Sequence, residues 1–285
     1  MNKYKECLIV IPARYASKRL EGKPLIKILG KEMVQRVYEN AMLVANKLKD
    51  VSVVVATDDS RILEFCNNNN INALLIDAPC RSGTQRVINT LLKINDSHIK
   101  YVINLQGDNP LCPPWFIENI INVLKRDENA DIVTPCVNLT WENLDNLKKI
   151  KESTPFSGTT VVFNDNFKAL WFSKQIIPAI RNEKEYREQS NFSPVYRHVG
   201  LYGFKADILL NKISGLSETK YERLEGLEQL SWLENNLSVK VIIADYKGRS
   251  EMSGVDTKDD LLRAESIIKK EGDFKVDYYG SSRFR

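Results

Sequence analysis

The sequence predicts a three-layer α/β fold with a mostly parallel central sheet. Continuous apolar, β-branched runs such as Cys7–Ile11 recur through residues 1–137, and such runs are typical of strands that are buried on both faces. Helical patterns separate these runs, and parallel neighbouring strands need a crossover helix of this kind between them. The alternation therefore favours a sheet covered by helices on both sides.

The first half of the chain supplies five strands and four helices. We expect the strands at 7–11, 51–56, 73–76, 101–105 and 132–137, and helices at 31–48, after 58–59 to about 67, 84–92 and 115–124. Asp58 and Asp59 are residue types that cap helix starts. Pro113 and Pro114 precede the fourth helix, as expected for a helix entered through proline. Each predicted element is thus bounded by a recognisable start signal or turn.

The pattern changes after about residue 150. We expect short paired strands at 159–163 and 169–172, an exposed helix or mobile loop at 181–190, and a strand at 199–204. A helix at 221–234, a strand at 239–244 and a helix at 258–269 complete the chain. We therefore expect one domain over 1–285, in which 151–204 is a β-rich subregion that serves either as an inserted subdomain or as an oligomer interface.

Net charge excludes some partners. Lysine and arginine total 41 against 37 acidic residues, a formal charge of +4, which is too mild to predict nucleic-acid binding. A small anionic substrate fits better, because it needs only a few cations in one cleft. We expect no nucleic-acid partner.

Cysteine spacing and hydropathy indicate a cytoplasmic protein. The five cysteines are scattered and form no CxxC pair, which argues against a zinc site and a disulfide framework. Reduced structural thiols are the simpler interpretation. No secretory signal is evident, and no stretch approaches the roughly 18 apolar residues that span a bilayer. We expect no membrane partner.

A basic loop follows the first predicted strand. Arg14, Lys18, Arg19 and Lys23 fall within residues 12–24, with Gly22 among them. Ligands of open α/β sheets bind at the carboxyl ends of strands, and guanidinium and ammonium groups suit phosphate oxygens. The loop is neither a P-loop nor a dinucleotide fingerprint. It favours a polyphosphate site, although a solvated basic loop has the same composition.

Two further segments place polar groups where a nucleotide and a metal would need them. Ser82-Gly83-Thr84 stands at a predicted helix start, which suits an anion or a base edge, although simple helix capping explains these residues as well. Asp108 follows a buried strand, and Asp256 is an isolated carboxylate near the end of the chain. Either carboxylate alone is an ordinary turn residue, but together they could hold Mg²⁺, which takes one or two protein oxygens.

Polar residues of the second half are candidates for lining a sugar pocket. His198 begins the strand predicted at 199–204, and Tyr202 lies four residues on, so both side chains are expected on the same side. In the helix predicted at 221–234, Leu224, Leu227 and Leu230 would form an inward stripe. Glu222, Glu225, Gln229 and Glu228 would then lie on the opposite face and at its flank. An ordinary solvated helix face is the alternative interpretation.

The order of these motifs along the chain carries a resemblance. Residues 12–25 (PARYASKRLEGKPL), 82–84 (SGT), 106–108 (QGD), 197–202 (RHVGLY), 227–230 (LEQL) and 254–257 (GVDT) resemble the 3-deoxy-manno-octulosonate cytidylyltransferase family. The resemblance extends from about residue 7 to residue 266. It implies a glycosyltransferase-A-like nucleotidyltransferase fold, usually a homodimer formed through the β-rich region, and transfer of CMP from CTP to an acidic 3-deoxy sugar for cell-surface polysaccharide.

The resemblance also implies roles for single residues. Arg14, Lys23 and Asp108 would be catalytic, and Asp108 with Asp256 would hold Mg²⁺. The nucleotide would be bound by Arg14, Ser17, Arg19, Lys23, Ser82 and Gln106, and the sugar acid by His198, Tyr202, Glu228, Gln229 and Lys174. The sugar hydroxyl would attack the α-phosphorus of CTP, with alignment and charge neutralisation supplying the rate.

The chain departs from the family pattern on the sugar side. Thr160, Lys174 and Ser231 stand where the pattern has other residues, and Asn109 replaces the commonest glutamate. Lysine in place of arginine removes a bidentate carboxylate contact. An amino-sugar analogue, 8-amino-8-deoxy-Kdo, or another ulosonic acid therefore remains open as the acceptor. A non-catalytic nucleotide-binding regulator is a remote alternative, because it would be expected to lack the phosphate loop or the metal carboxylates.

Overall fold

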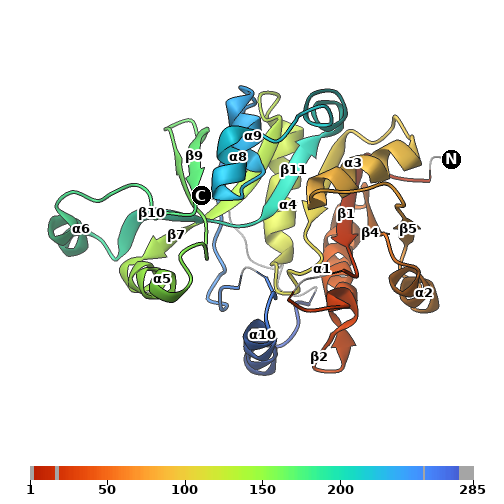
Figure 1. Cartoon of the computed structure of the whole chain (residues 1–285), viewed down its shortest axis with the longest axis horizontal. Helices are drawn as coiled ribbons and strands as arrows, with labels where there is room; N and C mark the ends of the chain where they lie inside the picture. Colours follow the sequence, from red (N-terminus) through yellow and green to blue (C-terminus); the bar gives the residue numbers. More distant parts are fainter. Residues whose placement is uncertain (1–2, 17–18, 253, 276–285) are drawn as a thin grey trace.

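One mixed sheet runs through the molecule, with helices on both faces (Figure 1). The computed structural model describes residues 3–16, 19–252 and 254–275. Its parallel half consists of β5 (Ala73–Leu75), β4 (Val51–Thr57), β1 (Cys7–Ala13) and β6 (Tyr101–Leu105), in that order. These strands are nearly the ones that the apolar runs predict. The three-layer α/β class is thereby confirmed.

The second half of the sheet is mainly antiparallel. β11 (Leu201–Lys205) pairs antiparallel with β6 and with β7 (Ile132–Thr140). Beyond β7 follow β10 (Phe192–His198), β8 (Thr160–Phe163) and the edge strand β9 (Ala169–Ser173), all antiparallel, while β12 (Val239–Ile243) pairs parallel with β7. The β-rich region thus continues the same sheet.

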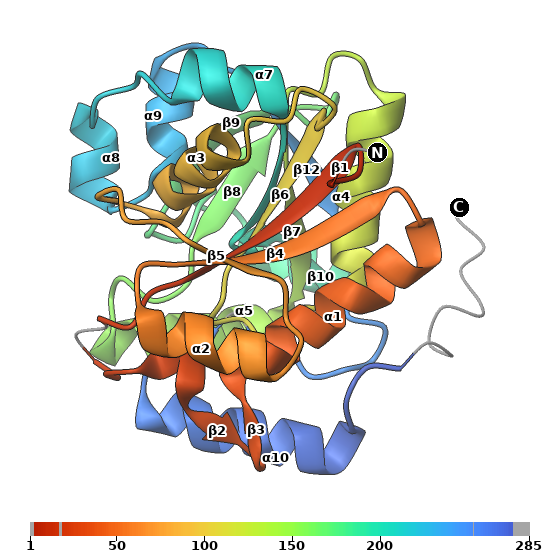
Figure 2. The ribbon, with the colours of Figure 1, turned by 90° about the vertical axis from the view of Figure 1, so that its right-hand side faces the viewer.

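Helices cover both faces of the sheet (Figure 2). On one face lie α1 (Met33–Leu48), α2 (Ser60–Asn68) and α4 (Pro114–Arg126); on the other lie α3 (Gly83–Ile94), α7 (Ala206–Ile208) and α9 (Gln229–Glu234). Strand β1 shows why: Ile9 packs with the α1 cluster, whereas its neighbour Val10 packs with the α3 cluster. Alternate residues of a strand point to opposite faces.

A third cluster lies below the sheet. It joins α10 (Lys258–Glu271) to the small hairpin of β2 (Lys27–Ile28) and β3 (Lys31–Glu32). Ile28, Leu111, Val255 and Ala264 are buried members of this cluster. The C-terminal segment is thereby held against the loops that follow β1 and β6, which places Asp256 near the first strands of the chain.

The remaining elements are short or peripheral. They are the 3₁₀ turn η1 (Lys23–Leu25), α5 (Trp141–Ser153), the exposed α6 (Glu183–Gln189), the π-helical turn η2 (Leu209–Ile213) and α8 (Lys220–Glu225). The sequence analysis did not predict α5, whose residues Trp141, Leu144 and Leu147 pack against β7 and β10. Of the two alternatives expected for 181–190, an exposed helix or a mobile loop, the structure has the exposed helix.

Two predicted elements differ from the structure. The helix expected over 221–234 is broken at Gly226, which has φ 65°, into α8 and α9. Leu227 and Leu230 are buried as predicted, but Leu224 is 67% exposed and Gln229, expected on the solvated face, is only 2% exposed. The strand expected over 199–204 is also wrong at its start, because His198 ends β10 and the chain turns at Val199–Gly200 before β11.

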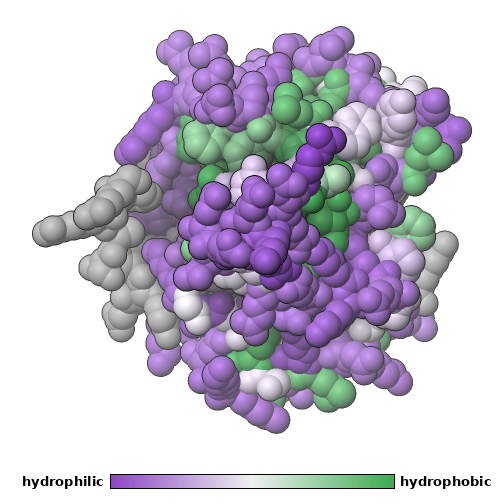
Figure 3. Space-filling view, turned by 90° about the vertical axis from the view of Figure 1, so that its left-hand side faces the viewer, coloured by the Kyte–Doolittle hydropathy of each residue, from purple (hydrophilic) through white to green (hydrophobic). Residues whose placement is uncertain are grey.

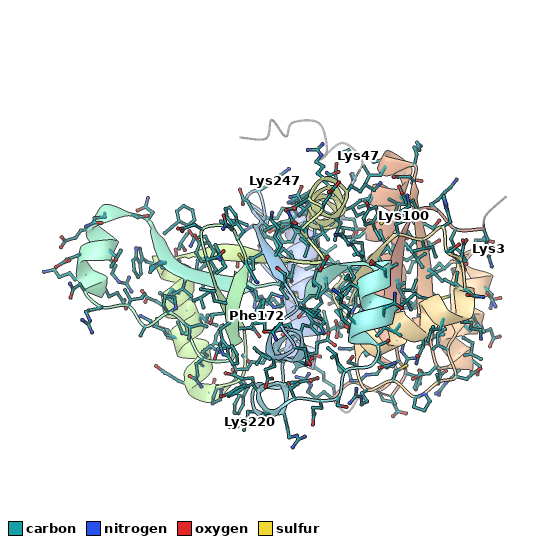
Figure 4. All side chains as sticks on the ribbon, turned by 90° about the horizontal axis from the view of Figure 1, so that it is seen from above. Lys3, Lys47, Lys100, Phe172, Lys220 and Lys247 are labelled. Carbon is teal, nitrogen blue, oxygen red and sulfur yellow. The ribbon has the colours of Figure 1, made fainter. Side chains whose placement is uncertain are left out.

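The labelled lysines lie on the outside of the molecule. Viewed from above, Lys47, Lys100 and Lys247 lie toward one side, Lys3 lies at one end and Lys220 lies on the opposite side, whereas Phe172 lies nearer the middle (Figure 4). Among the described residues, no helix is long and apolar enough to cross a lipid bilayer.

Candidate active site

The loop after β1 is bent back on itself by Gly22. Its backbone N–H donates to the carbonyl of Tyr15 at 3.0 Å, and its φ of 65° is a conformation that glycine adopts readily. A β-carbon there would meet the Tyr15 ring at 3.0 Å. The Arg61 guanidinium lies over that ring, 3.3 Å from its centroid. These contacts fix the turn that introduces Lys23.

Lys23 joins the two aspartates that the sequence analysis assigned to a metal. Its Nζ donates to Asp108 Oδ2 at 2.6 Å and to Asp256 Oδ1 at 2.9 Å. Arg19 forms an ion pair with the same Asp256 oxygen at 2.9 Å. The ammonium group is mostly buried and the two carboxylates are partly exposed. The structure thus brings together four charged residues from three separate segments.

Backbone hydrogen bonds of Val255 and of Asp256 itself hold Asp256 in place. The N–H of Val255 donates to the carbonyl of Asp108 at 2.8 Å, and the N–H of Asp256 donates to Asp260 Oδ2 at 3.0 Å. Burial acts to raise the pKa of Asp256, but Lys23 and Arg19 outweigh it and hold the pKa below its usual value. Asp256 is therefore a carboxylate at neutral pH, directly before the capped start of α10.

The donor set fits a Mg²⁺ ion that is bound mainly by its substrate. Among the described residues, no group of three or more histidine, cysteine, aspartate or glutamate side chains surrounds a common point. Asp108 and Asp256 nevertheless converge on one cation, the Lys23 ammonium. Mg²⁺ characteristically takes one or two protein carboxylates and completes its shell with water and phosphate oxygens.

A cavity of about 1080 Å³ opens above these charges. It lies at the carboxyl ends of β1 and β6 and at the start of α3, and its walls include Arg14, Arg19, Lys23, Ser82, Gln106 and Asp108. Most of the predicted nucleotide set is therefore assembled around one space. Ser17, which was also assigned to the nucleotide, lies outside the described residues, as does Lys18. The cavity is at the upper end of the volumes that enclose small ligands.

Arg86 also lines the cavity, although the sequence analysis gave it no role. Its side chain is buried, and Nη2 donates to Asp58 Oδ2 at 2.6 Å. The available signal was its spacing: Arg86 lies four residues after Ser82, so the two project from the same face of α3. Its second terminal nitrogen has no hydrogen-bond partner among the described residues.

The start of α3 faces the same cavity. Ser82 caps this 12-residue helix by accepting from the Gln85 N–H at 3.2 Å. The Gln106 amide lies directly against Gly83, where a β-carbon would meet Gln106 Oε1 at 2.9 Å. Unpaired backbone N–H groups at a helix start favour acceptors and anions. Ser82 thus both caps the helix and lines the cavity.

The residues expected to hold the sugar form a buried cluster. The rings of His198 and Tyr202 are 5.4 Å apart because the chain reverses between β10 and β11. Tyr202 Oη donates to Gln229 Oε1 at 3.0 Å, and Thr134 Oγ1 hydrogen-bonds His198 Nε2 at 2.8 Å. Burial and the cations Lys174 and Arg197 lower the pKa of His198 to about 3. His198 is therefore a neutral imidazole.

These residues do not line the large cavity, whose described walls contain neither His198, Tyr202 nor Gln229. All three are buried, and Gln229 Nε2 has no hydrogen-bond partner among the described residues. An unpaired buried donor is costly. The cluster thus keeps a donor that a bound hydroxyl or carboxylate would satisfy.

Lys174 extends from the end of β9 and is held through its backbone. Its N–H donates to Glu225 Oε2 at 2.7 Å, and its carbonyl accepts from Lys151 Nζ at 2.6 Å. Burial lowers the pKa of Lys174, although Glu225 and Asp256 act against that shift. Asp256 therefore lies within electrostatic reach of both Lys23 and Lys174. Glu225 was among the polar residues singled out in the helix predicted at 221–234, but no sequence signal pointed to Lys151, which is not near Lys174 along the chain.

Glu228 lies on the nucleotide side of the site. Its Oε1 accepts from Thr84 Oγ1 at 2.8 Å, and it lines a small cavity of about 40 Å³ behind Ser82. Burial raises the pKa of Glu228, against hydrogen bonds from Thr84 and Ser82 that lower it. The role in sugar binding that the resemblance implied for Glu228 stays a prediction.

Known cytidylyltransferases resemble this chain in sequence. Residues 8–242 match the family described as cytidylyltransferase. The 3-deoxy-manno-octulosonate cytidylyltransferase of Maricaulis maris is 41% identical over 266 residues, covering 93% of this chain and 98% of that protein. The mitochondrial 3-deoxy-manno-octulosonate cytidylyltransferase of Arabidopsis thaliana is 36% identical and covers 92% and 82% of the two chains.

Solved structures give the same result at the level of the fold. A CMP:2-keto-3-deoxy-manno-octonic acid synthetase complexed with CTP superposes with a TM-score of 0.78 at 33% identity, covering 93% of this chain and 99% of that one. A cytidylyltransferase of Leptospira borgpetersenii, only 15% identical, superposes with a TM-score of 0.59 over 96% and 91% of the chains.

Proposed function

The chain belongs to the cytidylyltransferase family, as one of its 3-deoxy-manno-octulosonate (Kdo) cytidylyltransferases, and on this premise we propose how its site makes CMP-Kdo and pyrophosphate from CTP and Kdo. The 2-hydroxyl of the sugar attacks the α-phosphorus of CTP. The bond from the α-phosphorus to the bridging oxygen breaks, and pyrophosphate leaves with the bonding electrons. The hydroxyl proton passes to solvent.

The observation that carries this assignment is the single cavity walled by the basic loop, the start of α3 and Asp108. Arg14 and Lys23 bind the triphosphate and neutralise the charge that develops on the leaving pyrophosphate. Ser82 and Gln106 hold the nucleoside end. No covalent intermediate is required, because alignment of the two substrates supplies much of the rate.

Asp108 and Asp256 would hold Mg²⁺ when CTP is bound. The ion would neutralise phosphate charge and lower the pKa of the attacking hydroxyl. Lys23 keeps the two carboxylates together, with Nζ within 2.9 Å of both. Arg19 adds a further positive charge beside Asp256. The role of the protein here is to hold like-charged carboxylates at one point next to the triphosphate.

The sugar acid would bind between Asp256 and the buried cluster of His198, Tyr202 and Gln229. Lys174 supplies the cation for its carboxylate, since its ammonium lies within electrostatic reach of Asp256 and His198. Gln229 Nε2 and neutral His198 would bond to sugar hydroxyls. Glu228 already accepts from Thr84 and Ser82, so it would accept from a sugar hydroxyl only alongside or in place of these bonds.

Pyrophosphate release tests the proposal. The purified protein would be incubated with CTP, Mg²⁺ and Kdo, and in parallel with 8-amino-8-deoxy-Kdo, and CMP-sugar would be identified by mass. Release that requires Kdo supports the assignment. Release with the amino sugar alone would move the acceptor to that analogue, and silence with both sugars, despite CTP binding, would overturn the assignment.

We also propose a homodimer that forms through the β-rich region, in a protein that acts in the cytoplasm, where CTP is made. Leu170 on edge strand β9, Phe192 on β10 and Phe167 in the β8–β9 turn are exposed apolar side chains of this region. Figure 3 shows hydrophobic surface around the polar projection at this end of the molecule. Sedimentation velocity would detect the dimer. Leu170→Asp should dissociate it, whereas Leu92→Asp, an equally exposed site on α3, should not.

A further inference from the structure

A chain of hydrogen bonds links Gln106, at the cavity, to Glu228 behind it. Gln106 Nε2 donates to Asn104 Oδ1 at 3.0 Å, Asn104 Nδ2 donates to Thr84 Oγ1 at 3.1 Å, and Thr84 Oγ1 donates to Glu228 Oε1 at 2.8 Å. These residues come from the end of β6, the first turn of α3 and the start of α9. We call these four side chains the base relay.

The Thr84 hydroxyl fixes the direction of the bonds in the base relay. A hydroxyl has a single hydrogen, and Thr84 donates it to Glu228 Oε1, so Thr84 can only accept from Asn104. Asn104 must therefore present its amide nitrogen to Thr84 and its oxygen to Gln106. Gln106 in turn must donate from Nε2 to Asn104, which leaves its Oε1 directed elsewhere.

Burial prevents Thr84 and Asn104, the two interior residues of the base relay, from forming other hydrogen bonds. Asn104 is fully buried and Thr84 is 3% exposed, so neither can reverse its hydrogen bonds by pairing with bulk water. The Ser82 hydroxyl also hydrogen-bonds Glu228. Ser82 therefore donates its one hydrogen to the Glu228 carboxyl group and can only accept hydrogen bonds from a ligand in the cavity. Ser82 and Gln106 are thus both left as acceptors by their connection to Glu228.

The orientation of Gln106 decides which base fits. The Gln106 amide lies against Gly83, a residue of the cavity wall. Its Nε2 is bonded to Asn104, whereas its Oε1 makes no hydrogen bond with a described residue and is the end left for a ligand. An acceptor there is complementary to the 4-amino group of cytosine. Uracil carries a carbonyl oxygen at the same position, which would meet Gln106 Oε1 with like polarity. A reversed amide would present its NH₂ group and favour uracil instead.

We propose that Glu228 is a positioning residue that makes the site selective for CTP over UTP, acting through the base relay on the Gln106 amide. This inference rests on the proposed function, because it concerns the nucleotide of the same reaction. It assigns Glu228 a role in selecting the nucleotide. It also assigns a role to Thr84 and Asn104, which belong neither to the basic loop nor to the proposed metal site.

The test compares two nucleotides in one variant. Glu228→Gln retains the side-chain shape but carries its own donor and no charge, so both directions of the base relay become possible. The ratio of kcat/KM for CTP to kcat/KM for UTP, at saturating sugar, should fall about tenfold, the size of one base-edge hydrogen-bond pattern. The ratio of the Kd values for CTP and UTP, measured calorimetrically without sugar, should fall similarly.

Matched variants distinguish an effect of the base relay on nucleotide selectivity from a local structural effect of the Glu228 substitution. Thr84→Val, which interrupts the relay, should lower the ratio, and Thr84→Ser, which restores the hydroxyl, should return it toward the wild-type value. Glu218→Gln removes an exposed carboxylate that lies before α8 and pairs with Arg223, and it should leave the ratio unchanged.

Two results would overturn the inference. One is a wild-type CTP-to-UTP ratio in Glu228→Gln; the other is an equal loss of the ratio in Glu218→Gln. A merely structural role for Glu228 would lower turnover with both nucleotides and keep the ratio. Failure of the proposed function itself is distinguishable, because it would appear as absent pyrophosphate release by the unaltered protein.

Discussion

The nucleotide side and the sugar side of the site are built in different ways. The nucleotide side consists of exposed or partly exposed charges on loops at the ends of parallel strands, around an open cavity. The sugar side consists of buried, mostly uncharged side chains at the junction with the antiparallel strands. Binding a polyanion depends mainly on the number of cations in the site and little on a close match of shape. Binding a polyhydroxylated sugar depends on hydrogen-bond donors and acceptors at particular positions. The difference predicts strong effects of charge removal on one side and smaller, substrate-specific effects on the other.

The largest effect is expected at the carboxylate pair. Asp256→Asn should lower kcat with CTP and Kdo by roughly a thousandfold, the order seen when a charge-stabilising group is lost, and should raise the Mg²⁺ concentration needed for half-maximal rate. Pyrophosphate release, with the far-ultraviolet circular dichroism spectrum as a check of folding, measures both. Asp259→Asn, in the exposed first turn of α10, is the matched control. Wild-type activity in Asp256→Asn would remove the metal assignment.

Arg14 should show the next largest effect. It is exposed and lines the cavity, so Arg14→Ala should raise the KM for CTP by about ten- to a hundredfold with little change in thermal stability. Arg14→Lys should restore part of the affinity, because lysine keeps the charge and loses the bidentate geometry. If Arg14→Ala bound CTP normally in calorimetry, the basic loop would not be the triphosphate site.

Lys174 should affect the other substrate. Lys174→Met should raise the KM for the sugar acid by about tenfold, the effect of losing one charged hydrogen bond, and should leave the KM for CTP unchanged. Lys168→Met, in the exposed β8–β9 turn, supplies the control. Equal changes in both KM values would mean that the two sides are not separable, and the comparison between them would be lost.

The smallest effect concerns His198 and is a change of stability. Its pKa in the folded protein, about 3, is below the usual 6.5, so the unfolded state binds the extra proton. The free energy of unfolding is therefore unaffected by the titration of His198 above pH 6.5. It decreases as the pH falls from 6.5 toward 3, by up to about 1.4 kcal/mol per pH unit. Urea unfolding at pH 7 and pH 5 should show a smaller difference in His198→Asn than in wild type. Equal differences would mean that His198 is protonated when folded.

Much of the site was predictable because its residues lie at strand ends. The apolar run of β1 predicts where Arg14 must begin a loop, and the run of β6 does the same for Asp108. The stretch around His198 was harder. A strand pattern over 199–204 does not reveal that the chain turns at Gly200, and the two rings meet through that turn, not through the alternation along one strand.

The sequence by itself determined the alternation of strands and helices, the capped helix starts and the basic loop, because these depend on backbone preferences and side-chain periods within a few residues. Only the tertiary structure decided that Lys23 would meet Asp256, 233 positions away, and that Glu228 would reach Thr84. Such contacts depend on the summed packing of the helices against both faces of the sheet, which no local pattern records. The break at Gly226 has the same origin, since a turn there buries Gln229 while leaving Leu224 in solvent.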